Sequence, residues 1–277
     1  MSANCISHNI SGIHSKQPWF VLSADTFLTN LTVENPVVSH FYRFELNKSE
    51  SPTIAIPDGC VDLIFYCNPD KPSAMVCGTT LQARQIEFDR NHPYFGVRFV
   101  PGVFPDFLEI DAEELIEKQY NMLDLIPNTQ SLFEQVITAE NFSQQINIVN
   151  AFLKKIDARS PSKLTTQIVA KICQQKGNIQ IKELERYSGY STRTLQRLFK
   201  QDVGLTPKGF SRAIRCQSAI YDINHSDRVI FSDLACDLGF SDQSHFLREF
   251  KKLVNATPME YQHQVKQSTY LERIHCY

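Results

Sequence analysis

The sequence predicts an α+β protein with two domains: a mainly β N-terminal half that ends in helices, followed by an all-α C-terminal half. Within the first hundred residues, short runs of aromatic and β-branched residues are separated by Pro and Gly, which is typical of strands joined by turns. From residue 106 onward, apolar residues recur with helical spacing instead. The 277 residues, 42% of them hydrophobic and 21% charged, are enough for two cores.

The expected domain boundary lies near the segment "DARSPSKL". Ser160 and Pro161 interrupt the helical pattern there, and Ser162 can cap the helix that follows. We therefore divide the chain into a sensor or dimerisation domain over residues 1–159 and a second domain over residues 160–277. The second domain is expected to fold on its own.

Strands are expected over about residues 18–104 and helices over about residues 106–158. The strand segments are "FYRFEL", "TIAIP", "VDLIFYC" and "YFGVRFV". The turn Pro57-Asp58-Gly59 separates two of them, because Pro presets φ and Asp-Gly accepts the positive φ of a tight turn.

The last predicted helix of the first domain carries an apolar stripe with two interpretations. Its residues recur at intervals of three and four, so they share one face of the helix. Such a stripe is typical of a core, and it is also where the seam of a homodimer is expected. Its members are Ile146, Val149, Leu153 and Ile156.

Charge is divided unevenly between the halves. Residues 1–159 contain 11 Lys and Arg against 19 Asp and Glu, a balance of −8. Residues 160–277 contain 17 against 11, a balance of +6. The second half is therefore the one expected to meet a polyanion, although a chance difference between two solvated surfaces also accounts for the numbers.

Several classes of protein are not expected. No stretch approaches the ~18 apolar residues of a membrane span, and the N-terminus lacks the charged and apolar regions of a secretory signal. The cysteines form no C-x-x-C pair, so reduced thiols in a cytoplasm are expected, with no metal and no cofactor. They stand at positions 5, 60, 67, 77, 173, 216, 236 and 276.

The C-terminal half contains an internal repeat. The segments at residues 184–210 and 234–261 share a Leu five residues before a Gly, then an aromatic residue and a Ser. Each then has two apolar residues four apart, Phe-Lys and, after a short break, Thr-Pro. The second copy has one extra residue between its Gly and the first member of this apolar pair.

Each copy predicts a helix-turn-helix unit, at about residues 181–203 and 231–254. Gly189 and Gly239 stand where the sharp turn after the first helix needs a positive φ. The apolar pair of the second helix points inward, which leaves its opposite face free for the base edges of DNA. Arg and Gln are the side chains that bond bidentately to guanine and adenine.

Two sets of residues are therefore predicted to contact DNA. The base-reading set is Arg193, Gln196 and Arg197 in the first unit and Gln243, Ser244, His245 and Arg248 in the second. The backbone set comprises helix N-terminal hydroxyls, with Ser191 and Ser241 as caps, and lysines that follow the helices. It is Ser191, Thr192, Lys200, Ser241, Lys251 and Lys252.

The double motif, with "GFSDQSHFLREFKK" followed by "TPMEY", resembles the AraC/XylS family of bacterial transcription regulators over roughly residues 163–264. The resemblance implies a seven-helix DNA-binding domain in which a long helix, here residues 207–224, joins the two units. Arg215 matches the usual Arg of that helix. Asn255 stands where the second copy normally has Gly, and Asn is the next best residue for a left-handed backbone position.

The N-terminal half is similar to the cupin-like sensor domains of some such regulators, through "IPDGCVDLIF" and "GVRFVPG". The resemblance implies a small effector or dimerisation, and no binding residue is assigned from it. Asp58 and Asp62 favour turn and strand-end roles over lining a pocket. Arg98 is expected to face solvent, with an inward anchor for an acidic effector as the alternative. Buried hydrophobic roles are expected for Cys60, Cys67 and Cys77, against a thiol sensor.

Together these features predict a one-component transcription regulator that binds double-stranded DNA of promoter regions and is controlled by an unknown small effector or by dimerisation. RNA polymerase and a second copy of the chain are further candidate partners. The alternatives are a helical protein-interaction adaptor and a thiol-based redox-responsive regulator. An enzyme of the alkylation-repair type would need a nucleophilic Cys in a recognisable setting, so no enzymatic activity is expected.

Overall fold

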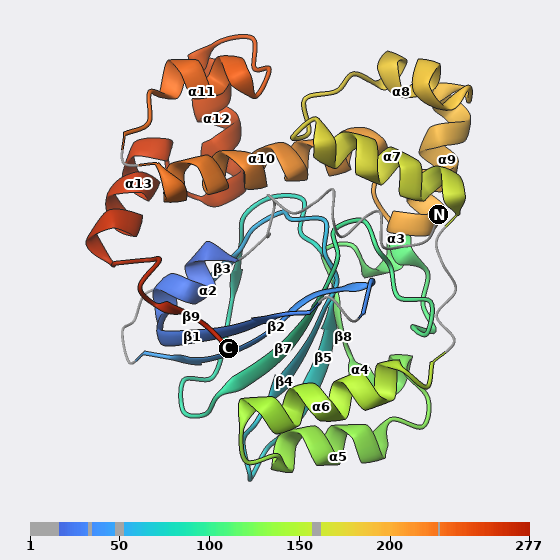
Figure 1. Ribbon diagram of the computed structural model, residues 1–277, viewed down its shortest axis with the longest axis vertical. Helices are drawn as coiled ribbons and strands as arrows, with labels where there is room; N and C mark the ends of the chain where they lie inside the picture. Colours follow the sequence, from blue (N-terminus) through green and yellow to red (C-terminus); the bar gives the residue numbers. More distant parts are fainter. Residues whose placement is uncertain (1–16, 33–34, 48–52, 157–161, 227) are drawn as a thin grey trace.

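The computed structural model describes residues 17–32, 35–47, 53–156, 162–226 and 228–277. Cys5 and the expected boundary residues Ser160 and Pro161 lie outside the described residues. The N-terminal half forms a twisted sheet, and a layer of helices from the C-terminal half lies across one end of it (Figure 1).

In the described part of the chain, seven strands form one sheet and two form a second, smaller one. They are β1 (Ala24–Leu31), β2 (Val38–Leu46), β3 (Thr53–Ala55), β4 (Asp62–Tyr66), β5 (Ser73–Cys77), β6 (Arg84–Ile86), β7 (Tyr94–Phe99), β8 (Gln119–Asn121) and β9 (Ile274–Cys276). The large sheet has the order β8-β5-β4-β7-β2-β1-β9, and β3 pairs with β6. Neighbouring strands are antiparallel except β1 and β9, which are parallel.

The described helices of the N-terminal half are α2 (Pro18–Ser23), α3 (Ala112–Leu115), α4 (Met122–Leu125), α5 (Gln130–Thr138) and α6 (Phe142–Leu153). Those of the C-terminal half are α7 (Lys163–Gln174), α8 (Ile181–Ser188), α9 (Thr192–Val203), α10 (Pro207–His225), α11 (Phe231–Asp237), α12 (Gln243–Val254) and α13 (Pro258–Gln267). The second group contains the seven helices that the family resemblance implies. Ser162 caps α7 as expected, because its side chain accepts a hydrogen bond from Thr165 N.

The central strands β4 and β7 place alternate residues on opposite faces of the sheet, and both faces are covered. Leu63 and Phe65 of β4, with Phe95 of β7, belong to the core that α4, α5 and α6 close. The residues between them face the other way, and the backbone pairs Asp62 directly with Arg98. The pleat therefore turns the charged pair of these two strands to the side away from α5 and α6.

The apolar stripe of α6 lies in the core. Ile146, Val149 and Leu153 are buried in the same core as Leu63 and Phe95 of the sheet. Ile156 lies beyond the end of the helix and is half-buried. The prediction of a dimer seam on this stripe is therefore wrong, because the chain's own sheet already covers it.

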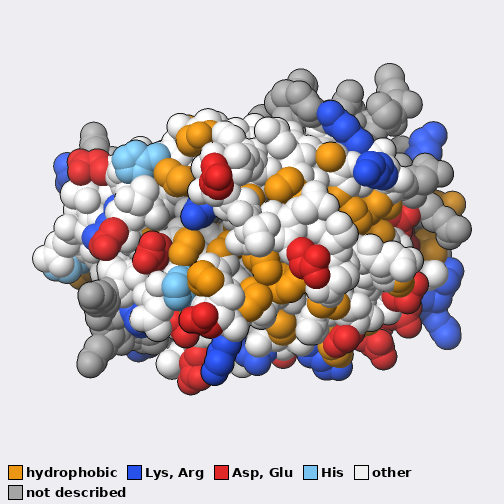
Figure 2. All heavy atoms as spheres, turned by 90° about the horizontal axis from the view of Figure 1, so that it is seen from below, with side chains coloured by type: hydrophobic (Ala, Val, Ile, Leu, Met, Phe, Trp, Pro, Cys, Tyr) orange, Lys and Arg blue, Asp and Glu red, His pale blue; other side chains and the backbone are white. Residues whose placement is uncertain are grey.

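The opposite end of the molecule from α7–α13 shows apolar side chains with acidic ones among them (Figure 2).

Residues 18–23 form a helix where a strand was predicted. Pro18 stands at its first position, where the missing N–H costs nothing, and the aromatic residues behind it are buried. Trp19 packs edge-on to Tyr261, with ring centroids 5.7 Å apart, and its Nε1 donates to the carbonyl of Val254 at 2.9 Å. The residues of α2 also fit a strand pattern. In the folded chain they form a helix that packs, through Trp19, on the distant C-terminal half.

The two halves share one core. A single buried cluster contains Trp19 and Phe44 of the N-terminal half together with Ile220, Phe250 and Tyr261 of the C-terminal half. Strand β9 adds a further link, because it pairs with β1 at the edge of the N-terminal sheet and lies beside it in Figure 1. Within the described residues, β9 is the one departure from the all-α C-terminal half that the sequence predicts.

Candidate nucleic-acid interface and ligand pocket

The first helix-turn-helix unit is formed by α8 and α9. Gly189 ends α8 with a φ of 75°, and the side chain of Ser191 caps α9 by accepting a hydrogen bond from Thr194 N. Leu195 and Phe199 of α9 are buried, as their four-residue spacing predicts. The polar face carries the predicted base-reading set of this unit, all exposed: Arg193, Gln196 and Arg197.

The second unit is formed by α11 and α12, and its helix begins one residue later than expected. The N-cap is Asp242, whose carboxylate accepts a hydrogen bond from His245 N at 2.7 Å, so the prediction of Ser241 as the cap is wrong. The extra residue in the second copy explains the shift, because it moves the inward pair to Phe246 and Phe250 and the helix start with it. The hydrogen bond from His245 N lowers the pKa of Asp242 below its ordinary value.

The predicted base-reading residues of the second unit differ in exposure. Gln243, Ser244 and Arg248 are exposed, and Lys251 and Lys252 extend the same polar surface at the end of α12. His245 is half-buried, its ring stands edge-on to Phe240 with centroids 5.3 Å apart, and its Nδ1 lies 3.1 Å from Ser241 Oγ. Contact of these side chains with DNA stays a prediction, and His245 is the one already engaged within the unit.

Lys200, predicted to contact the DNA backbone, is paired with the N-terminal half. Its Nζ lies 2.5 Å from Glu113 Oε1 of α3. Behind this pair, α9 ends at Gly204 with a φ of 82°, and a Cβ there would come within 2.3 Å of the carbonyl oxygen of Ala112. Sequence reasoning missed Glu113, because nothing local indicates that α3 packs on α9.

Helix α10 joins the two units, and Arg215 at its middle contacts the segment before α8 and the turn of the second unit. The guanidinium donates to the carbonyl of Gly177 at 3.1 Å and lies 5.1 Å from the ring centroid of Phe240. Partial burial lowers the pKa of Arg215 below its ordinary value. A cavity of about 690 Å³ lies between α8, α10 and α12, with the Arg212–Glu249 pair, 2.5 Å apart, in its wall.

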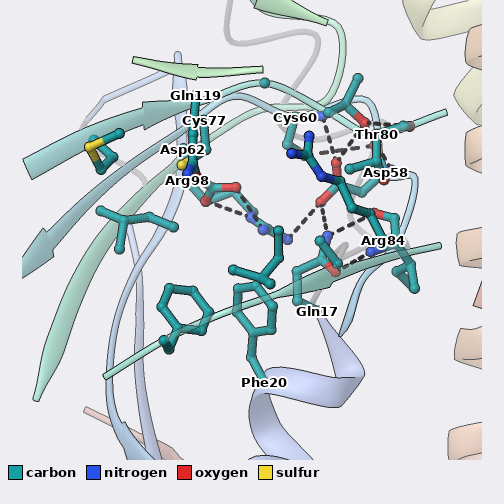
Figure 3. A pocket seen from close by; sticks show the side chains of 18 of the residues that line it. Gln17, Phe20, Asp58, Cys60, Asp62, Cys77, Thr80, Arg84, Arg98 and Gln119 are labelled. Carbon is teal, nitrogen blue, oxygen red and sulfur yellow. Dashed lines mark hydrogen bonds and ion pairs between the residues drawn. The ribbon is translucent and has the colours of Figure 1, made fainter. Parts of the chain in front are cut away.

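The N-terminal half contains a second cavity, of about 220 Å³, on the face of the sheet opposite α5 and α6. Figure 3 shows Arg98 and Asp62 on one side of it, Asp58 on another and Phe20 opposite the charged groups. The pleat of β4 and β7 accounts for this, since it directs Asp62 and Arg98 to the same side. The turn after β3 contributes Asp58. Asp58 and Asp62 thus lie at the turn and the strand end, as favoured, and they also line a pocket, which was the alternative.

Arg98 is 2% exposed, so the expectation that it faces solvent is wrong. Its Nη1 lies 3.0 Å from Asp58 Oδ2, and its Nε and Nη2 donate to the two oxygens of Asp62 at 2.9 and 2.8 Å. Gln17 donates to Asp58 at 2.7 Å, and Tyr42 donates to Asp62 at 3.1 Å. Burial raises the pKa of Asp58, although the Arg98 charge opposes the shift.

The thiols of the described residues are mostly buried or half-buried. Burial raises the pKa values of Cys77, Cys173 and Cys216 to about 12, so these thiols stay protonated and weakly nucleophilic at neutral pH. Cys60 is buried beside the carbonyl of Asp58, and Cys67 is half-buried.

No group of three His, Cys, Asp or Glu side chains within the described ranges could hold a metal ion. No described helix is long and apolar enough to cross a membrane.

Two family models match the chain. A helix-turn-helix domain matches residues 184–264, which include most of the first unit and all of the second. A domain of unknown function (DUF6597) matches residues 35–121, which include most of the sheet and most of the pocket.

The relatives are bacterial regulators. The chain is 26% identical over 108 residues to an uncharacterized HTH-type transcriptional regulator of Haemophilus influenzae, a match that spans 39% of this chain and only 36% of that protein. It is 37% identical over 208 residues to the HTH-type transcriptional activator RhaS of Escherichia coli, which covers 73% of this chain and 68% of RhaS. Among solved structures, ToxT from Vibrio cholerae is similar with a TM-score of 0.45 and 13% identity, over 86% of this chain and 98% of that one.

This match covers more residues than α7–α13 contain, whereas RhaS sequences of other Escherichia coli strains match over 70 residues, 25% of this chain. The repeat, the two units on one long helix and this relative agree. The chain belongs to the AraC/XylS family of transcription regulators.

Proposed function

We propose that this protein is a one-component regulator in the cytoplasm that reads promoter DNA with both helix-turn-helix units, without enzymatic activity. The observation that carries the proposal is the pair of exposed polar helix faces on α9 and α12, each backed by a buried apolar pair and both fixed to α10. Because α10 has 19 residues, it spans roughly 28 Å at a rise of 1.5 Å per residue. This length suits two recognition helices in successive major grooves, roughly 34 Å apart.

The N-terminal half is proposed to restrain the first unit. Helix α3 lies against the end of α9, and Glu113 holds Lys200, a cation that would otherwise be available to a phosphate. A conformational change that moves α3 would therefore change the affinity of α9 for DNA, provided that a ligand binds the two states unequally. A small effector bound in the N-terminal cavity is the proposed source of that difference.

RNA polymerase and a second copy of the chain remain proposed partners. The homodimer has no assigned surface, because the stripe predicted for it is buried in the core. Burial, which raises the pKa values of Cys77, Cys173 and Cys216 to about 12, argues against these three thiols as redox sensors.

Selection of bound fragments from a genomic DNA pool by the full-length protein tests the proposed function. A shared site with two short unlike blocks, whose affinity falls as salt rises, is the expected result. Lys251→Ala should weaken binding to all sequences alike and flatten the salt dependence, whereas Lys71→Ala, at an exposed position of the N-terminal half, should change neither. Recovery of no preferred sequence, with a folded protein, would favour the helical adaptor instead.

A further inference from the structure

We propose that the cavity of the N-terminal half binds a small organic cation, an ammonium group carried on a flat aromatic body. The inference rests on the proposed function, because it names the effector of the regulator. It follows from the balance of charge at the floor of the cavity and from the side chains of its walls (Figure 3).

Among the described residues, the floor of the cavity holds more carboxyl groups than cationic groups. Two carboxylates, Asp58 and Asp62, meet one guanidinium, that of Arg98, and all three residues are buried. Both carboxyl groups share the Arg98 guanidinium, and burial raises the pKa of Asp58, so one cation does not fully stabilise two carboxylates there. An acidic ligand would add further negative charge to this site. An ammonium group would instead complete the neutralisation of the cluster.

Asp62 is the carboxylate that a ligand can reach. Its side chain is 10% exposed, whereas those of Asp58 and Arg98 are each 3% exposed. Asp58 already accepts hydrogen bonds from Cys60 N, Thr79, Gln17 and Arg98. Asp62 Oδ2 accepts a hydrogen bond from Arg98 Nη2 at 2.8 Å, and a carboxylate oxygen can accept a second donor from the cavity.

The walls suit an aromatic body. Four rings line the cavity as one connected group, with centroid distances of 5.2 Å for Phe20–Phe88, 4.7 Å for Phe88–Tyr94 and 4.8 Å for Tyr66–Tyr94. Ring faces attract cations as well as other rings. The cavity of about 220 Å³ is smaller than the ~300–1,000 Å³ typical of drug-sized ligands, so the occupant is small.

The charged groups at the rim do not reverse this preference. Among the described lining residues, Arg84 and Lys118 are matched by Glu87 and Glu117. All four are exposed, so solvent screens them more than it screens the buried floor. The Arg84 guanidinium also donates to the carbonyl of Glu117.

The walls of the cavity are connected to the recognition helix α9 and to the joining helix α10. Residues 117–119 line the cavity and follow α3 directly, so they join the rim to the Glu113–Lys200 pair. On another side, Gln217 of α10 donates to the carbonyl of Pro57 at 3.0 Å, next to Asp58. A ligand that occupies the cavity therefore contacts segments that lie against α9 and α10.

Binding of three matched probes to the full-length protein tests the proposal: 2-phenylethylamine, 2-phenylethanol and 3-phenylpropionate, followed by calorimetry and by the melting temperature. The amine should bind at least tenfold more tightly than the alcohol, and the carboxylate should give no saturable binding. Equal or tighter binding of the carboxylate would overturn the proposal. So would the failure of a wider panel of aromatic amines to bind at millimolar concentration.

Two variants locate the site. Asp62→Asn should remove the preference for the amine over the alcohol, whereas Asp70→Asn, at an exposed position outside the cavity, should retain it. Since Asp62 also holds Arg98, Met75→Trp provides a second variant that fills the cavity without touching the charged cluster, and it should abolish binding of every probe. Unchanged amine binding in a folded Met75→Trp protein would place the ligand elsewhere.

Binding to the selected DNA, measured without any probe, separates this proposal from the proposed function. Intact DNA binding without amine binding overturns only the class of effector. Loss of sequence preference in DNA binding overturns the regulator itself, whatever the probes do.

Discussion

At the scale of single residues, Asn255 occupies the left-handed region, with a φ of 64°, at the end of α12. A residue with a Cβ and no local hydrogen bond is strained there by about 1–2 kcal/mol. Asn255→Ala should therefore lower the free energy of unfolding by about 1 kcal/mol, whereas Asn255→Gly should leave it unchanged or raise it slightly. Urea denaturation of the three proteins measures the difference, and equal losses for both variants would show that the side chain matters, not the backbone angle.

Arg197 and Arg248 lie on different units, so each should read a different block of the DNA site. Arg197→Ala should lose on the order of 1–3 kcal/mol of binding free energy at the first block and Arg248→Ala a similar amount at the second, if each guanidinium bonds a guanine. Gel shifts on sites scrambled in one block at a time measure this. If Arg248→Ala lost the same affinity on intact and scrambled second blocks, α12 would hold the DNA backbone without reading bases.

At the scale of secondary-structure elements, α6 is an integral part of the N-terminal core. Leu153→Glu should place a charge among buried apolar side chains and cost several kcal/mol of unfolding free energy, about the loss of large core truncations. The variant should unfold or aggregate. Ala151→Glu, at an exposed position of the same helix, should remain folded in size-exclusion chromatography and in thermal melts. A stable, monomeric Leu153→Glu protein would instead support the predicted dimer interface on α6.

The contact between α3 and α9 makes its own prediction. Glu113→Gln should free Lys200 and raise the affinity for DNA severalfold at low salt, with a smaller gain at high salt because the pair is half-exposed. Glu114 is exposed on the same short helix, and Glu114→Gln is the matched control that should change DNA binding far less. Equal gains for both variants would indicate a general effect of negative charge, since each removes one.

The elements that sequence reasoning placed correctly depend on local chemistry. The glycines after α8 and α11, the caps of α7 and α9 and the apolar pairs of α9 and α12 are all set within a dozen residues. The features it missed depend on distant partners: α2 is helical beside α13, Arg98 is buried by two carboxylates, and Glu113 meets Lys200 across the halves. The cap of α12 is the exception among the local features. The extra residue of the second repeat moves the cap to Asp242, one residue after the expected Ser241.

At the scale of the whole molecule, the shared core determines how the halves behave when separated. A fragment of residues 162–277 would lose the N-terminal members of this cluster, among them Trp19, which packs on Tyr261 and donates to the carbonyl of Val254 in the full chain. Contrary to the expectation of an autonomous domain, the fragment should melt at a lower temperature and less cooperatively than the full chain, and circular dichroism measures both. A fragment with the full chain's melting temperature would show that the cluster adds little to stability.

The pairing of β9 with β1 has a consequence for synthesis. Asn30, on β1, donates a hydrogen bond to the carbonyl of Tyr277, and the two residues are 247 positions apart. At the ribosome's ~5–20 residues per second, β9 is synthesised on the order of tens of seconds after β1. During that interval the growing sheet has an open hydrogen-bonding edge, which is a template for pairing with other chains. The nascent protein is therefore expected to need a chaperone on this edge until β9 emerges and replaces it.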